Sequence, residues 1–127
     1  MTEPTMPEKF AHNAELAIRT LRDQCGVTLD YDEASVVWLD GYIERLRGGI
    51  DPEFKDSLVG VFGSYLGECI RRRFGGRWDE TDGRWAIRFD EKNAAFPFAK
   101  VVKQFEHGPQ DSIAAFYRAI PAFFKPS

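Results

Sequence analysis

The chain has 127 residues and a mass of 14.5 kDa, a size at which a single domain can bury most of the surface that its unfolded form exposes. Hydrophobic residues make up 43% and charged residues 29%, which excludes an extensively disordered chain. No stretch approaches the roughly 18 consecutive apolar residues of a membrane span, and the start at Thr2-Glu3-Pro4 does not resemble a signal peptide. We expect one cytoplasmic domain over residues 1–127, with flexible ends at 1–6 and 125–127.

Three helices are predicted in the first part of the chain. Apolar residues recur on one helical face over residues 7–24. A second helix follows Asp30 or Asp32, either of which can act as its N-cap, and ends at 48–49, a pair of glycines. The third covers residues 52–74, with a proline in its first turn and a capping aspartate before it.

The third helix is apolar around most of its circumference, which predicts a central position in the fold. Gly60, Gly63 and Gly67 gather on its remaining side. Each glycine inside a helix costs about 1 kcal/mol relative to alanine, so three on one face indicate that another backbone packs closely there. We expect a second helix at this face, and a ligand groove is the alternative.

A β-hairpin is the only strand signal. Residues 77–81 and 84–90 flank Asp82-Gly83, a pair suited to a tight two-residue turn. This register places Trp78 opposite Ile87. One face then carries apolar side chains, and the other carries basic ones: Trp78, Trp85, Ile87 and Phe89 against Arg77, Arg84 and Arg88. Because a lone hairpin is marginal in water, we expect its aromatic face to cover the helices.

Two further helices close the chain. Pro97 begins the first, which Gly108 ends, and Asp111 or Ser112 caps the second, which Pro121 breaks or kinks. The predicted fold class is α+β, a mainly helical single domain with a two-stranded β-hairpin packed on the helical layer.

Charge is unevenly spread along the chain. Residues 1–60 carry 6 basic and 12 acidic side chains, and residues 61–127 carry 11 basic and 8 acidic ones, within a formal net charge of −3. Solvated helix faces are the favoured explanation over a dedicated binding field.

Neither the cysteines nor the histidines predict a metal or redox site. Cys25 and Cys69 each lie on the apolar stripe of a predicted helix, so we expect two buried structural thiols. His12 and His107 are far apart in the sequence, without the acidic spacing of a metal site. The sequence therefore predicts no metal, no cofactor and no catalytic residue.

Several motifs together resemble a family of small bacterial domains of unknown function. These motifs lie within about residues 29–120, and an upstream Trp38-Leu39-Asp40 also fits. They are Tyr65-Leu66-Gly67-Glu68, Gly75-Gly76-Arg77-Trp78, Phe96-Pro97-Phe98 followed by Lys100-Val101, and Asp111-Ser112-Ile113 through Phe116-Tyr117. The resemblance implies a compact α+β domain of bacterial origin and carries over no catalytic residues.

Glu68 is the most conspicuous acid, because it lies late in the apolar helix within one turn of Arg71 and Arg72. A partly buried carboxylate can act as a general base or anchor a ligand amine. An ordinary ion pair at a helix end is the favoured explanation. A pocket in which Glu68, Arg72 and an aromatic side chain converge would instead favour an enzyme or a small-molecule binder.

Arginines around the hairpin form a second candidate surface. They include Arg71, Arg72, Arg73, Arg77, Arg84 and Arg88. Arginine forks suit phosphate and carboxylate groups, and Trp78 or Trp85 can stack on bases. The sequence pI of about 5.4 and the interleaved acids argue against nucleic acid.

The function that we predict is a non-catalytic cytosolic bacterial module that contacts another protein, in an accessory, regulatory or immunity-type role. The alternatives are a small enzyme or small-molecule binder using Glu68 with Arg71 and Arg72, and a weak nucleic-acid binder. The predicted ligand-binding residues are Glu68, Arg71, Arg72, Arg77, Trp78 and Arg88.

Overall fold

A computed structural model of the chain describes residues 2–123, and the tail predicted to be flexible at 125–127 lies outside them. Five α-helices, one 3₁₀ turn and a small antiparallel sheet make up this described part. The prediction of a mainly helical α+β fold that carries a hairpin is therefore confirmed.

The helices lie where apolar periodicity and capping residues predict them. Thr5 and Glu8 form a reciprocal capping box at the start of the first helix. Asp32, and not Asp30, caps the second, and Asp51 caps the third. The bounds are Met6–Cys25 for α1, Glu33–Leu46 for α2, Pro52–Phe74 for α3, Pro97–His107 for α4 and Ile113–Phe123 for α5, with the 3₁₀ turn η1 at Gly108–Asp111.

The last helix differs from its prediction at the C-terminal end. Ser112 caps α5, because its Oγ accepts a hydrogen bond of 3.1 Å from the backbone N–H of Ala115. The helix then continues through Pro121 to Phe123. Pro121 therefore does not break α5, since its missing N–H removes a single hydrogen bond of the helix, and the kink stays a prediction.

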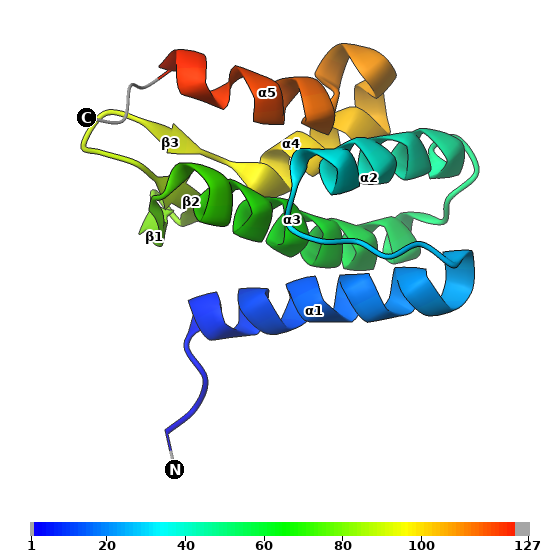
Figure 1. The fold of residues 1–127 in the computed structure, drawn as a ribbon, viewed down its shortest axis with the longest axis horizontal. Coiled ribbons are helices and arrows are strands. Elements are labelled where there is room, and N and C mark those ends of the chain that lie inside the picture. The colour runs from blue at the N-terminus through cyan, green and yellow to red at the C-terminus, as the bar shows by residue number, and fades with distance from the viewer. Residues whose placement is uncertain (1, 124–127) are drawn as a thin grey trace.

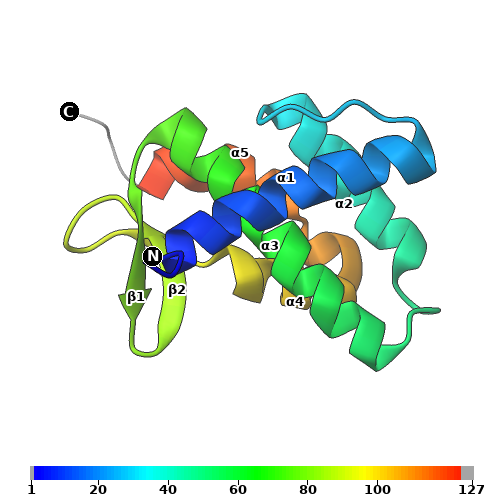
Figure 2. The ribbon, with the colours of Figure 1, turned by 90° about the horizontal axis from the view of Figure 1, so that it is seen from below.

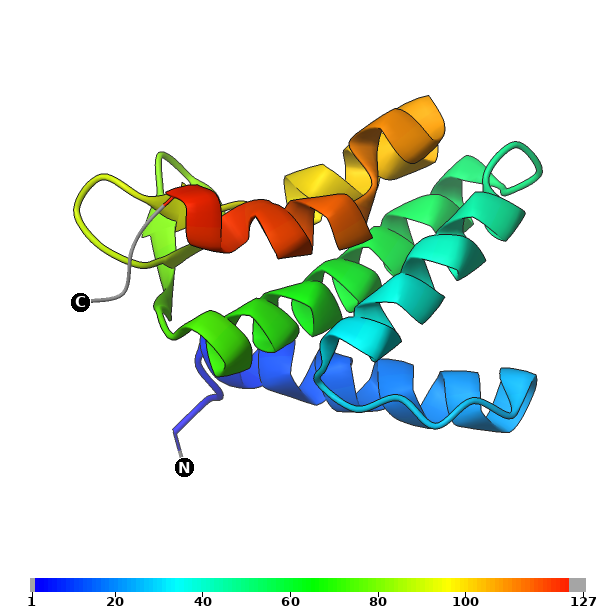
Figure 3. The same ribbon diagram turned by 45° about the horizontal axis from the view of Figure 1, so that its top comes forward.

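The helices form three layers with α3 in the middle (Figure 1). α1 covers one side of α3 and runs in the opposite direction, while α4 and α5 lie on the other side. Figure 2 shows that α1 crosses α3 near the middle of both helices, so that their ends diverge on either side of the crossing. α2 lies beside the N-terminal half of α3, at the end opposite the hairpin (Figure 3). The central position predicted for α3 is confirmed.

The sheet has one more strand than predicted. β1 (Arg77–Thr81) and β2 (Arg84–Arg88) form the hairpin, and Trp78 pairs with Ile87 as expected. β2 ends two residues earlier than predicted, and β3 (Ala94–Ala95) pairs with it in antiparallel fashion. A strand of two alanines has no alternating pattern, so its sequence gives no strand signal.

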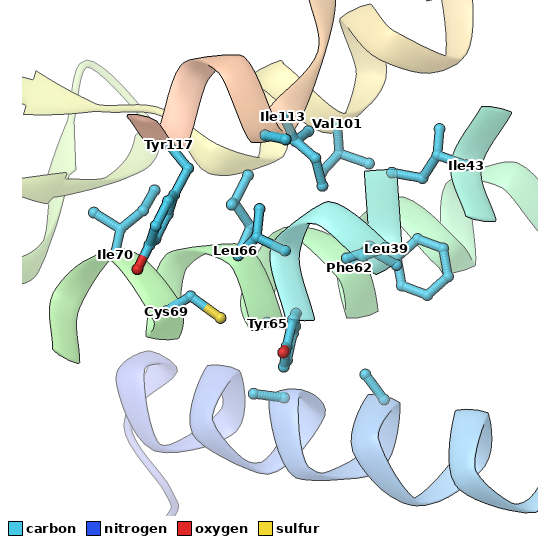
Figure 4. Packing of buried hydrophobic residues seen from close by; sticks show 14 of the residues in the cluster. Leu39, Ile43, Phe62, Tyr65, Leu66, Cys69, Ile70, Val101, Ile113 and Tyr117 are labelled. Atoms are coloured by element: carbon cyan, nitrogen blue, oxygen red, sulfur yellow. The ribbon is translucent and has the colours of Figure 1, made fainter. Parts of the chain in front are cut away.

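The core lies between α3 and the layers on its two sides. Figure 4 shows Leu66 and Ile70 of α3 near Tyr117 of α5, and Tyr65 on the side of α1. Cys69 is buried as predicted, whereas Cys25 is exposed. The prediction for Cys25 is wrong because it is the last residue of α1, at the end where this helix has diverged from α3 (Figure 2).

The second helix expected at the glycines of α3 is α4, and aromatic rings lie beside two of these glycines. A Cβ atom at Gly63 would lie 2.2 Å from the ring of Phe98, and one at Gly67 would lie 2.1 Å from the indole of Trp78. A Cβ at Gly60 would meet nothing within 4 Å. The expected second helix is therefore present at Gly63 and Gly67, but side chains and not backbone fill the space beside the two glycines.

Candidate functional site

Glu68 is buried near the C-terminal end of α3, with only 1% of its surface exposed. Its Oε2 accepts hydrogen bonds from Arg71 Nε at 2.9 Å and Trp78 Nε1 at 3.0 Å. Its Oε1 accepts one from Arg71 Nη2 at 3.0 Å, and Arg72 Nη2 lies 3.7 Å away. The bidentate contact with Arg71 is the ion pair expected between neighbouring turns of the helix. The hydrogen bond from the Trp78 indole links the hairpin to this pair.

These contacts decide the protonation of Glu68. Burial alone raises the pKa of a carboxyl group, but the hydrogen bonds from Arg71 and Trp78 and the nearby charge of Arg72 outweigh it, so the Glu68 pKa is lowered. An ionised carboxylate with both oxygens engaged is a poor general base, because it has little tendency to take a proton at neutral pH. The geometry favours a structural role for Glu68.

A hollow of about 390 Å³ adjoins this cluster, between the start of α1 and the end of α3. Four of the predicted ligand-binding residues, Glu68, Arg71, Arg77 and Trp78, line it. Arg72 is absent from the lining residues, and its guanidinium lies 3.6 Å from the ring centre of Tyr31. Glu68, Arg72 and an aromatic ring therefore do not converge in this hollow, as they would in the pocket expected of an enzyme or a small-molecule binder.

Arg88, the remaining predicted ligand-binding residue, is neutralised within the sheet. It lies opposite Arg77, as the hairpin register predicts. Its Nε donates to Asp79 Oδ2 at 2.9 Å and its Nη2 donates to Thr81 Oγ1 at 2.9 Å. Arg84 instead lies 4.4 Å from the ring centre of Phe96. The arginines of the hairpin are therefore distributed among separate partners.

The tryptophans pack inside the protein. Trp78 is 8% exposed, and its ring centre lies 4.5 Å from that of Phe10 and 5.8 Å from that of Phe98. Trp85 is half-buried, with its ring centre 5.5 Å from that of Phe10. The prediction that the aromatic face of the hairpin covers the helices is confirmed, which weakens the interpretation of these rings as stacking surfaces for bases.

A second buried polar cluster has no counterpart in the sequence analysis. Gln104 of α4 is fully buried, and its Nε2 donates to Asp40 Oδ1 at 3.1 Å and to Glu44 Oε2 at 3.0 Å. Its Oε1 accepts from the backbone N–H of Ile113 at 2.9 Å. Gln104 thus ties two carboxylates of α2 to the start of α5.

Asp40 also caps α5 from a different helix. Its Oδ2 accepts hydrogen bonds from the hydroxyl of Ser112 and, at 3.0 Å, from the backbone N–H of Ala114. A carboxylate is favourable at this end because the first backbone N–H groups of a helix lack partners within it. The sequence signals only Asp111 or Ser112 as the cap, because Asp40 lies about 70 residues earlier.

An apolar groove of about 250 Å³ opens where α1 and α3 diverge (Figure 2), and Tyr42 of α2 also contributes to it. The lining side chains are mostly hydrophobic: Leu16, Ala17, Thr20, Leu21, Gln24, Tyr42, Phe54, Ser57, Leu58, Val61 and Phe62. Phe54 is 57% exposed and Leu16 is 38% exposed. Large exposed apolar side chains gathered at one hollow are typical of contact surfaces. In the sequence, no pattern marks Phe54 or Leu16 as exposed.

No family model, curated protein or solved structure matches the chain. Within residues 2–123, no helix combines the length and hydropathy needed to cross a bilayer. The same residues contain no cluster of three or more histidine, cysteine, aspartate or glutamate side chains that could hold a metal ion.

Proposed function

We propose that the protein is a non-catalytic interaction module whose partner binds the apolar groove between α1 and α3. The observation that carries the proposal is the exposure of Phe54. Its side chain is 57% exposed, and it lines a groove whose other side chains are mostly apolar. Covering such a surface is favourable, at roughly 25 cal/mol per Å² of apolar area removed from water.

The walls of the groove indicate the kind of segment that fits it. Both are helices, whose backbone groups are satisfied internally, so they offer no row of free donors and acceptors to an extended chain. Recognition must come from side chains. An amphipathic helix of another protein, which presents apolar residues at one face, is the matching partner.

The buried cluster around Glu68 supports this proposal over an enzyme. Both carboxylate oxygens of Glu68 accept hydrogen bonds from Arg71. Glu68 therefore lines the adjoining hollow as one half of an ion pair. The accessory, regulatory or immunity-type role and the bacterial, cytoplasmic setting stay predictions that follow from the sequence.

A site-specific cross-link tests the proposal. We would place a photoreactive benzoylphenylalanine at Phe54 in cells of the source organism and, as a control, at Gln110, which is exposed on η1. A protein captured at position 54 and not at 110 would then be purified and titrated against the chain. We expect Phe54→Asp to weaken its binding at least tenfold, because aromatic anchors dominate interface energies, and Gln110→Asp to leave it unchanged.

Two results would overturn the proposal. One is an absence of position-specific capture at 54. The other is equal affinity of the purified partner for Phe54→Asp and the unaltered chain, with circular dichroism confirming that the variant is folded.

A further inference from the structure

The free edge of β3 borders a second groove, on the opposite side of the molecule from α1. Two hollows of about 260 and 250 Å³ share Ala94, Ala95 and Phe116 as lining residues. They therefore adjoin along β3, on the side where α5 passes it (Figure 1). The other lining residues are Phe89, Lys92, Asn93, Ile120 and Phe123 in the first hollow and Arg84, Phe96, Ala99, Lys100 and Lys103 in the second.

The backbone of β3 is available to another strand. The sheet order is β1-β2-β3, so within residues 2–123 β3 pairs on one side only. Asn93 C=O accepts a hydrogen bond of 2.9 Å from Phe89 N–H. Hydrogen-bonded pairs alternate along an antiparallel ladder, so Ala94, opposite Arg88, belongs to the intervening pair. Its N–H and C=O consequently point away from β2, toward the free edge.

Positive charge surrounds this edge. Among the residues that the structure describes, the two hollows are lined by four cationic side chains and by no aspartate or glutamate. The cations are Arg84, Lys92, Lys100 and Lys103. Lys100 forms an ion pair with Asp111, in which Lys100 Nζ lies 3.1 Å from Asp111 Oδ1. The other three cations leave an excess of positive charge at the groove, which suits an acidic occupant.

The remaining lining is aromatic and aliphatic, which suits apolar side chains of the same occupant. Phe96 and Phe116 of the second hollow are half-buried, and Phe123 at the end of the first is 67% exposed. A strand that pairs with Ala94 would place alternate side chains on opposite faces. Each hollow is lined by both cationic and aromatic side chains, so acidic and apolar residues of the occupant both find partners at this edge.

We propose that the free edge of β3 binds an extended, acidic segment of a partner protein by adding a short strand to the sheet. Backbone pairing at Ala94 favours a peptide over a nucleic acid, because bases and phosphates cannot complete a strand ladder. This surface is separate from the groove between α1 and α3, so the two proposals stand or fall independently.

Synthetic peptides test the proposal without knowledge of the natural partner. The probe is a fluorescein-labelled octapeptide in which acidic residues alternate with phenylalanine and valine. The first control peptide has lysine at every acidic position. A second control keeps the acids and replaces the apolar residues by proline, which removes half of the backbone donors. Binding is followed by fluorescence anisotropy at about 150 mM salt, where long-range attraction is screened.

We expect the acidic peptide to bind at least tenfold more tightly than either control, and to shift the amide resonances of Ala94 and Ala95. The double variant Lys92→Glu/Lys103→Glu should lose at least tenfold in affinity. Lys9→Glu/Lys55→Glu, which changes two cations outside the groove by the same charge, should not.

Three outcomes would overturn the proposal. The first is equal binding of the lysine peptide and the acidic peptide, which would contradict the role of charge. The second is equal binding of the proline peptide, which would contradict the addition of a strand. The third is displacement of the acidic peptide by an eight-nucleotide oligothymidylate at a lower concentration than by the unlabelled peptide, which would make this edge a nucleic-acid site.

Discussion

The two buried polar clusters differ in how far apart their members lie in the sequence. Glu68 bonds to Arg71 and Trp78, three and ten residues away. Gln104 bonds to Asp40 and Glu44, which are 64 and 60 residues away. The first cluster fastens the hairpin to the end of α3, and the second fastens α2 to α4 and α5. Short separations follow from helix periodicity, whereas long ones require the folded arrangement.

The largest expected effect is at the Glu68 cluster. Trp78→Ala removes a ring that packs on Gly67 and Phe98 together with the donor to Glu68, and should lower the free energy of unfolding by about 3 to 5 kcal/mol. Trp85→Ala, at a half-buried ring, should cost about 2 kcal/mol. Urea denaturation measures both. Equal losses would show that the indole bond and the close packing add nothing.

The cluster around Gln104 gives the second effect. Gln104→Leu keeps the volume but leaves Asp40, Glu44 and the N–H of Ile113 without this partner. We expect a loss of about 2 to 3 kcal/mol, because each unsatisfied buried group costs about 1 to 3 kcal/mol and the carboxylates are only partly buried. Gln110→Leu, on the exposed 3₁₀ turn, is the control. A change below about 1 kcal/mol would mean that the long-range cluster is incidental to stability.

Glycines of α3 give a matched pair of opposite sign. Gly67→Ala places a Cβ 2.1 Å from the Trp78 indole, so overpacking should destabilise the protein by about 1 to 3 kcal/mol. Gly60→Ala meets open space within the helix and should stabilise it by about 0.5 to 1 kcal/mol. Thermal denaturation distinguishes the two. A loss of stability in both variants would contradict the assignment of open space beside Gly60.

The smallest effect is the pH dependence that Glu68 contributes. Its pKa in the folded protein lies below the ordinary 4.5, so the stability it adds is complete above that value and is lost as the pH falls through the lowered pKa. Since Asp32, Asp90 and Asp111 also have lowered pKa values, the comparison with Glu68→Gln isolates the contribution of Glu68.

Urea denaturation of the unaltered chain and Glu68→Gln between pH 3 and pH 7 gives this difference directly. We expect the difference in unfolding free energy to be constant at neutral pH and to shrink in acid. Glu80→Gln, at an exposed position of β1, is the control for the loss of one negative charge. Parallel profiles for the unaltered chain and Glu68→Gln down to pH 3 would contradict the lowered pKa.

The sequence predicted the fold well where the signals are local. Capping by Asp32 and Asp51, the apolar circumference of α3 and the hairpin register are all set by neighbouring residues. The exposure of Cys25 and the rings beside Gly63 and Gly67 were not predicted, because they depend on where α1 diverges and on which side chains approach α3. Helical periodicity identifies a face but not what covers it.

The candidate sites divide in the same way. The pairing of Glu68 with Arg71 was visible as a three-residue spacing, and the sequence favoured the structural explanation that the geometry supports. The bond from Trp78 was not visible, because it depends on how the hairpin folds back on α3. Phe54 and Leu16 were missed as surface groups, since only the divergence of α1 from α3 leaves them uncovered.

The sequence by itself determined the helices, the hairpin and its register, because hydrogen bonds within helices, caps and tight turns join residues a few positions apart. Only the tertiary structure decided that Asp40 caps α5, that two alanines become a sheet edge, and that cations from β2, α4 and the intervening loop meet around it. These contacts join segments that are far apart in the sequence, and packing of the whole core decides how such segments lie. No pattern of neighbouring residues predicts them.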